Sequence, residues 1–130
     1  MTRDDSHRDA VELPLLDDAQ LGELESLDAR QGGGLLRRLV EIFESQGPDA
    51  FDDLRRALEA GDADAVAATA HSLKGGYRSL GVARAAALAA EIESMGRAQS
   101  LADGPRVLAA LERCFAASRA ALHERLSRAD

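Results

Sequence analysis

The chain has 130 residues, enough for one domain with a modest core; 45% of them are apolar and only 3% aromatic. A formal net charge of −7 argues against nucleic acid or an anionic membrane as a general partner. No apolar stretch approaches the ~18 residues that cross a bilayer, and the N-terminus lacks the apolar core of a signal peptide. We therefore expect a cytoplasmic protein.

Composition also indicates the fold class. Ala, Leu, Glu and Arg are abundant and β-branched residues are few, which favours an all-α chain. The single cysteine, Cys114, cannot form an internal disulfide, and its place in an apolar helical pattern predicts that it fills the core.

The N-terminal part divides into a tail and a first helix. Residues 1–13 are charged and lack periodicity, which predicts a disordered tail followed by a single domain over 14–130. Asp17 or Asp18 is the expected N-cap of the first helix. Its apolar face carries Leu21, Leu24 and Leu27, and a glycine-rich loop at 32–34 ends it.

The next helical pattern contains a break. Segment 35–46 has apolar residues at core spacing, Gly47-Pro48 interrupts it, and the pattern resumes as far as Ala60. The sequence leaves open whether this is one helix kinked at Pro48 or two helices. The expected core residues are Leu36, Leu39, Val40, Phe43, Phe51, Leu54 and Leu58.

Two helices then form a predicted hairpin. Gly61-Asp62 supplies a stop and a cap for a helix over 63–80, which Gly81 closes. A second helix over 83–95 follows, with Gly96 as its stop. The inward residues are Val66, Ala70, Leu73, Tyr77 and Leu80 on the first helix, and Ala85, Leu88, Ile92 and Met95 on the second.

Asp103-Gly104-Pro105 begins the last helix. Its core side carries Leu108, Leu111, Phe115, Ser118 and Leu122. Short loops between amphipathic helices imply antiparallel neighbours. The sequence therefore predicts an antiparallel up-down four-helix bundle with an additional short N-terminal helix.

The helix over 63–80 carries the main candidate site. At 100° per residue, His71, Lys74, Gly75 and Arg78 all point away from the core. The stretch from His71 to Arg84 has basic residues and no acidic one, which suggests an anionic target. A glycine inside a periodic helix costs ~1 kcal/mol relative to Ala, so an outward Gly75 is better explained by close approach of another molecule than by packing.

Glu93 is the candidate second residue of this site. His71 lies ten residues before Gly81 and Glu93 twelve after it, so the hairpin brings them to a similar height. Each also directly follows a core residue, which places it on the flank of an inward stripe. Glu93 is therefore expected to hold one imidazole nitrogen and fix the tautomer, and the alternative is a plain solvated glutamate.

The segment His71-Ser72-Leu73-Lys74-Gly75-Gly76, continuing to Leu80-Gly81, resembles the histidine-containing phosphotransfer (HPt) domain family. The resemblance covers roughly residues 17–125, including Glu93-Ser94-Met95-Gly96-Arg97. It departs from the family at Tyr77 and Arg78, where small residues are usual.

This resemblance implies that His71 accepts a phosphoryl group from a receiver-domain aspartyl phosphate and passes it to another receiver. Lys74 would stabilise the charge on the transferring oxygens. The expected partners are response-regulator receivers or a hybrid sensor histidine kinase, and the expected chain is a monomer without kinase activity of its own. We expect no intrinsic cofactor or metal site, with Mg²⁺ supplied by the receiver. The residues expected at the docking surface are Gly75, Gly76, Arg78, Arg84 and Arg97.

Two other classes of function fit this sequence less well. A helical adaptor that binds a receiver or kinase without being phosphorylated would have no need of both His71 and Lys74. A histidine-kinase dimerisation domain would need an attached ATP-binding domain, for which 130 residues leave no room. His7 and His123 have no ligand-type neighbours in the sequence and are expected to be solvated.

Overall fold

The computed structural model describes residues 12–129, and all regular secondary structure within that range is helical. This confirms the all-α prediction. The expected tail over 1–13 lies almost entirely outside the described residues. The helices are α2 (Asp18–Arg30), α3 (Leu35–Ala60), α4 (Ala63–Leu80), α5 (Ala83–Arg97) and α6 (Gly104–Ala129).

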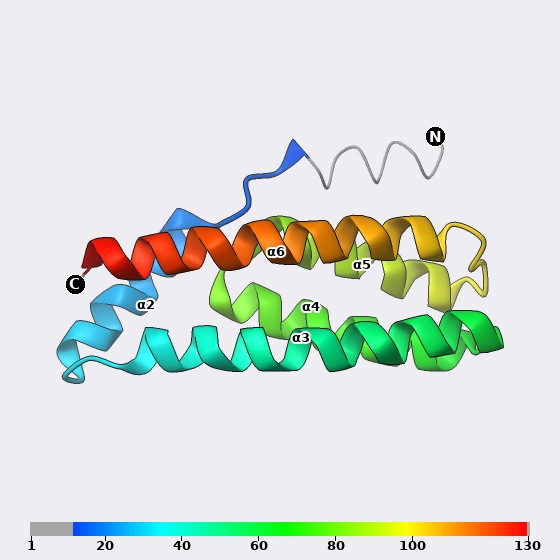
Figure 1. The fold of residues 1–130 in the computed structure, drawn as a ribbon, viewed down its shortest axis with the longest axis horizontal. Helices are drawn as coiled ribbons and strands as arrows, with labels where there is room; N and C mark the ends of the chain where they lie inside the picture. The colour runs from blue at the N-terminus through cyan, green and yellow to red at the C-terminus, as the bar shows by residue number, and fades with distance from the viewer. Residues whose placement is uncertain (1–11, 130) are drawn as a thin grey trace.

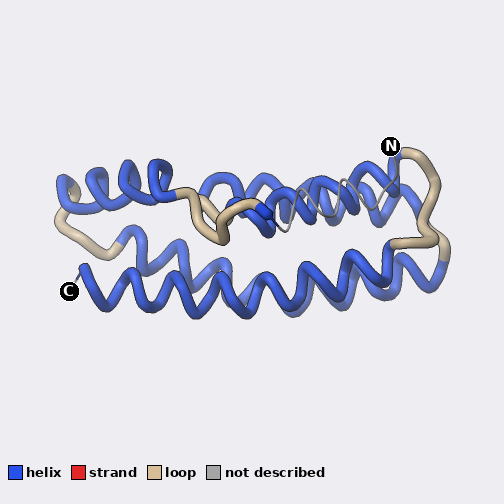
Figure 2. Tube along the Cα trace, turned by 90° about the horizontal axis from the view of Figure 1, so that it is seen from above, coloured by secondary structure: helices blue, strands red, loops and turns tan. Residues whose placement is uncertain are grey.

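The two longest helices, α3 and α6, span the length of the molecule (Figures 1 and 2). Side chains pair Glu44 with Arg119 and Arg55 with Glu112, so the two helices run in opposite directions. Helix α4 packs against α3 and α5, and α5 packs against α6. The shorter α2 contacts α3 and α4 at the end of the molecule where the C-terminus also lies (Figure 1).

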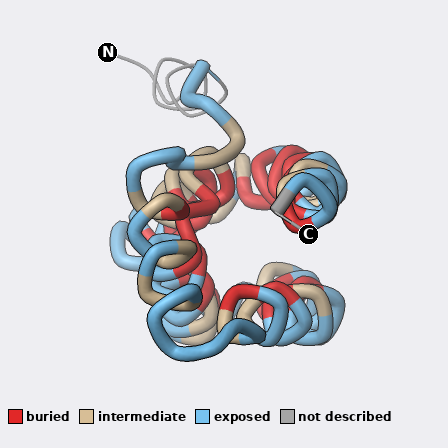
Figure 3. Tube along the Cα trace, turned by 90° about the vertical axis from the view of Figure 1, so that its left-hand side faces the viewer, coloured by how far each residue is buried: buried red, intermediate tan, exposed pale blue. Residues whose placement is uncertain are grey.

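The core lies where the apolar stripes of these helices meet. Viewed along the helices, buried residues gather on the inward sides and exposed residues on the outside (Figure 3). A helix that buries one apolar stripe gains most of its stability from that packing rather than from intrinsic propensity. The stripe predicted for α4 is confirmed at all five positions, namely Val66, Ala70, Leu73, Tyr77 and Leu80.

Pro48 lies inside a single helix, which answers the question that the sequence left open. Phe43 and Phe51, on opposite sides of the proline, both pack on Phe115 of α6, with ring centroids 4.6 and 5.3 Å away. Gly47 is also buried, and a Cβ there would collide with the Phe115 ring. Packing on Phe115 thus holds both halves of α3 against α6. The helix continues through Pro48 although proline has no backbone N–H to donate to the preceding turn.

The turn between α4 and α5 fixes how these helices align. Gly81 has a left-handed φ of 88°, which glycine adopts without strain, and it ends α4 as predicted. Its carbonyl accepts a hydrogen bond from the backbone N–H of Asp17 at 2.8 Å. The Asp17 side chain in turn caps α2 by accepting from the Gln20 N–H. The turn is therefore tied to the start of α2.

The prediction that Gly96 stops α5 is wrong, because the helix continues through it to Arg97. Gly96 is buried, and a Cβ there would lie 2.7 Å from Ala67 N and 2.8 Å from Ala63 O. Its lack of a side chain allows α4 and α5 to approach closely instead of ending the helix. This extension also puts Arg97 on the same helix as Glu93, one turn beyond it.

Candidate functional site

His71 projects from the outer side of α4, and its side chain is 62% exposed. The core residues Ala70 and Leu73, on either side of it in the sequence, are buried and hold this part of the helix against the rest of the molecule. The outward position predicted from helical periodicity is confirmed.

Glu93 of α5 lies directly beside this histidine. The Nδ1 atom of His71 is 2.8 Å from Oε2 of Glu93. The Glu93 side chain is only 6% exposed, so the alternative of a solvated glutamate is wrong. The hairpin alignment predicted from the distances to Gly81 is confirmed.

Two cations also bind the Glu93 carboxylate. Lys74 Nζ lies 2.5 Å from Oε1, while Arg97 Nη2 and Nε lie 2.6 and 3.1 Å from Oε2. The hydrogen bond from Lys74, followed by those from Arg97, lowers the pKa of Glu93 to about 2 against the opposing effect of burial. Glu93 is therefore ionised at neutral pH. We call His71, Lys74, Glu93 and Arg97 the Glu93 cluster.

The ionised carboxylate determines which nitrogen of His71 is available for chemistry. A carboxylate accepts hydrogen bonds but cannot donate them, so Nδ1 must carry the proton in this contact. In neutral imidazole the other nitrogen, Nε2, then keeps its lone pair. The arrangement presents a nucleophilic nitrogen on the exposed part of the ring.

The surface next to His71 on α4 is open. A Cβ built on Gly75 or Gly76 would meet no atom within 4 Å, and Arg78 beyond them is exposed. Gly75 therefore has no packing role, in agreement with the sequence argument. These three predicted docking residues lie on the exposed side of the helix that carries His71.

The other two predicted docking residues are engaged elsewhere. Arg84 is half-buried at the start of α5, where its Nε donates a hydrogen bond to the carbonyl of Leu13 at 2.7 Å. Arg97 binds Glu93. Whether either residue also contacts a partner stays a prediction.

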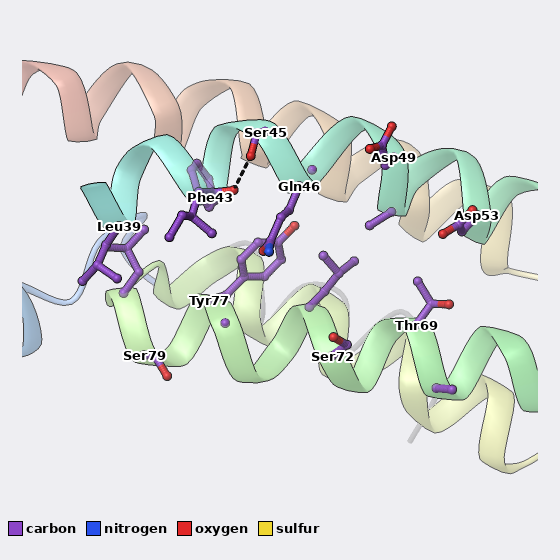
Figure 4. A pocket seen from close by; sticks show the side chains of 17 residues that line it. Leu39, Phe43, Ser45, Gln46, Asp49, Asp53, Thr69, Ser72, Tyr77 and Ser79 are labelled. Atoms are coloured by element: carbon purple, nitrogen blue, oxygen red, sulfur yellow. Dashed lines mark hydrogen bonds between the residues drawn. The ribbon is translucent and has the colours of Figure 1, made fainter. Parts of the chain in front are cut away.

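A groove of about 830 Å³, which the sequence does not predict, runs between α3 and α4 (Figure 4). Ser72 and Gly76, which line it, adjoin His71 and Gly75 in the chain. The Tyr77 ring reaches across it from α4 toward α3 (Figure 4). Its hydroxyl is buried with no hydrogen-bond partner among the described residues, and burial raises its pKa. The inward direction predicted for Tyr77 is thus confirmed, but its unpaired hydroxyl has no signal in the sequence.

Within residues 12–129, no three His, Cys, Asp or Glu side chains are grouped so that they could hold a metal ion. No helix in the same range is long and apolar enough to cross a membrane. His123 is exposed, and its Nε2 lies 2.9 Å from Glu44 Oε1. His7 lies outside the described residues.

Comparison with known proteins identifies the family. Residues 38–121 match the sequence model of the Hpt domain. The fold is similar to the crystal structure of histidine-containing phosphotransfer protein B (HptB) from Pseudomonas aeruginosa PAO1, with a TM-score of 0.79 and 31% sequence identity over 88% of this chain and 96% of that one. No curated protein matches the sequence significantly. The matched region includes the whole Glu93 cluster, and the chain belongs to the Hpt domain family.

Proposed function

We propose that this protein is a phosphorelay intermediate in which His71 carries the phosphoryl group. The observation that supports this best is the contact between His71 Nδ1 and the ionised Glu93, because it holds the ring proton on Nδ1 and makes Nε2 the reactive nitrogen of the neutral imidazole, on an exposed ring. The structurally similar HptB is named as a histidine-containing phosphotransfer protein, and membership of the Hpt family favours the same role here.

In the proposed reaction, the Nε2 lone pair attacks the phosphorus of an aspartyl phosphate on a receiver domain. An N–P bond forms as the bond from phosphorus to the aspartyl oxygen breaks, and the aspartate leaves as a carboxylate with the electron pair. The Nδ1 proton stays on the ring, where Glu93 balances the positive charge that the phosphorylated imidazole gains. The reverse reaction passes the group to a second receiver.

Lys74 and the receiver would stabilise the transferring oxygens. Lys74 Nζ is bound to Glu93, and its side chain is still 19% exposed, within one helical turn of His71. Cations adjacent to the transferring group are the main source of catalysis in phosphoryl transfer, and we expect the Mg²⁺ to come from the receiver. The protein would act as a substrate and donor without kinase activity of its own.

The proposed domain covers residues 14–130 and acts as a monomer. We infer that α3 to α6 form an antiparallel up-down four-helix bundle, with α2 as the additional short N-terminal helix. The opposite directions of α3 and α6, and the hairpin of α4 and α5, support this topology.

The decisive experiment is incubation with a receiver domain phosphorylated on its aspartate. Wild-type protein should gain a phosphoryl group that is labile in acid and stable in base, and His71→Gln should gain none. Equal labelling of His71→Gln would contradict the proposal. Binding of the receiver without any labelling of the wild type would favour a non-phosphorylated adaptor instead.

A further inference from the structure

Arg97 shares one carboxylate oxygen with His71. Its Nη2 and Nε atoms lie 2.6 and 3.1 Å from Glu93 Oε2, and His71 Nδ1 lies 2.8 Å from the same oxygen. The guanidinium is therefore held within the Glu93 cluster although its side chain is 66% exposed. This geometry ties Arg97 to the chemistry of the histidine and not only to the surface of the molecule.

The charges in the cluster determine whether the ring of His71 takes up a second proton. An isolated carboxylate beside an imidazole favours the protonated ring, which has no lone pair at Nε2 and cannot attack phosphorus. In this protein the Glu93 carboxylate binds two cations, Lys74 at Oε1 and Arg97 at Oε2. These two cations therefore offset the attraction that the carboxylate exerts on a further ring proton.

Charged groups also lie on the elements around the cluster. Arg78 lies on the same face of α4, two turns beyond His71, and adds positive charge in the same sense. On the α3 side, Asp49 and Asp53 line the groove, and His71 is not among the residues lining it. Of the two cations that bind Glu93, Arg97 is the more exposed, at 66% against 19% for Lys74. It is therefore the one that can be replaced with less disturbance of the fold.

We propose that Arg97 is a positioning residue for phosphoryl transfer: by binding the oxygen of Glu93 that holds Nδ1, it keeps the His71 ring neutral and its Nε2 lone pair free. The proposal rests on the function proposed above for His71. It differs from a docking role, because a docking residue alters the affinity for a partner without changing how the histidine takes up protons.

The first test is an NMR titration of the ring protons of His71 in unphosphorylated protein. Arg97→Gln should move the titration midpoint upward by roughly half a pH unit. The substitution removes one positive charge that is partly screened by solvent and separated from the His71 ring by the Glu93 carboxylate. Arg97→Lys keeps the charge and should restore most of the wild-type midpoint. Arg78→Gln removes an exposed cation that has no contact with Glu93, and should move the midpoint less than Arg97→Gln does.

The second test uses phosphoramidate, a small phosphoryl donor that needs no docking surface. Nε2 bonds to phosphorus as the P–N bond of the donor breaks and ammonia leaves. For Arg97→Gln the acid limb of the rate profile should shift with the NMR midpoint, so the rate one pH unit below the midpoint falls roughly threefold. The plateau rate at higher pH should not change.

A wild-type midpoint in Arg97→Gln, or an equal shift in Arg78→Gln, would overturn the proposal. So would a uniformly lower plateau with no shift, which indicates a purely structural role. A wild-type protein that accepts no phosphoryl group from phosphoramidate or a receiver would overturn the proposed function instead. The NMR titration would then still report on the charges around the histidine.

Discussion

Among single residues, we expect Glu93 to have the largest effect on the chemistry of the site after His71 itself. It is a buried carboxylate that accepts hydrogen bonds from His71, Lys74 and Arg97, and its ionised state follows from them. Removing it would take away the acceptor that fixes the imidazole tautomer and would leave Lys74 without its anionic partner.

Glu93→Ala should slow phosphoryl transfer to His71 by roughly ten- to a hundredfold, the usual cost of losing a residue that orients a reactive imidazole. Single-turnover labelling from a phosphorylated receiver measures this rate. Glu59→Ala, at an exposed glutamate near the end of α3, is the matched control and should label at the wild-type rate. A wild-type rate in Glu93→Ala would remove this residue from the site.

At the scale of elements, two glycines have opposite roles. Gly96 allows α4 and α5 to touch, because a Cβ there would lie within 3 Å of backbone atoms of Ala63 and Ala67. Gly75 has only open space around it, so it costs helix stability without any packing gain. The packing of α4 on α5 explains the first glycine, and we expect access to the histidine to explain the second.

Gly96→Ala should destabilise the protein by about 2 kcal/mol or more, because backbone atoms cannot move aside as a flexible side chain can. Gly75→Ala should instead stabilise it by about 1 kcal/mol and slow labelling by a receiver, with little effect on labelling by phosphoramidate. Thermal unfolding and the two labelling rates measure these effects. Unchanged receiver labelling in Gly75→Ala would contradict its role in close approach.

The sequence predicts a helix and its buried face well where apolar residues recur with a clear helical period. The α4 stripe is correct at every position, because a strict 3.6-residue pattern leaves a single way to bury the helix. The end of α5 is mispredicted at Gly96, because the sequence does not distinguish a glycine at a close contact between helices from a glycine that ends a helix. The pairing of His71 with Glu93 follows from counting residues around Gly81, but the contact of Arg97 with the same oxygen depends on α5 continuing past Gly96.

For the molecule as a whole, three carboxylates join different pairs of helices, and all have lowered pKa values. Glu25 binds Arg125 between α2 and α6, Glu44 binds Arg119 between α3 and α6, and Glu93 binds Lys74 between α5 and α4. A carboxylate whose folded pKa lies below its unfolded value stabilises the fold above the unfolded pKa. That stability is lost as the pH falls through the folded pKa.

The free energy of unfolding should therefore decrease in acid. Glu93 accounts for the largest part, about 3 kcal/mol at most, lost between its ordinary pKa of 4.5 and a pH of about 2. Denaturant unfolding at a series of pH values should show a shallower decline for Glu93→Gln than for the wild type. Parallel declines in the two proteins would show that this carboxylate does not contribute.

The contrast in exposure between His71 and Glu93 has a consequence for how such proteins diverge. The proposed reactive group is on the surface, whereas the carboxylate bound to it is inside, so we expect largely different residues to govern reactivity and recognition. We expect substitutions at exposed positions such as Arg78 to change which receivers fit, with less effect on the reactivity of the imidazole than changes within the Glu93 cluster. On the proposed function, signalling connections could thus be rewired through the surface of α4 while the transfer reaction itself is inherited intact.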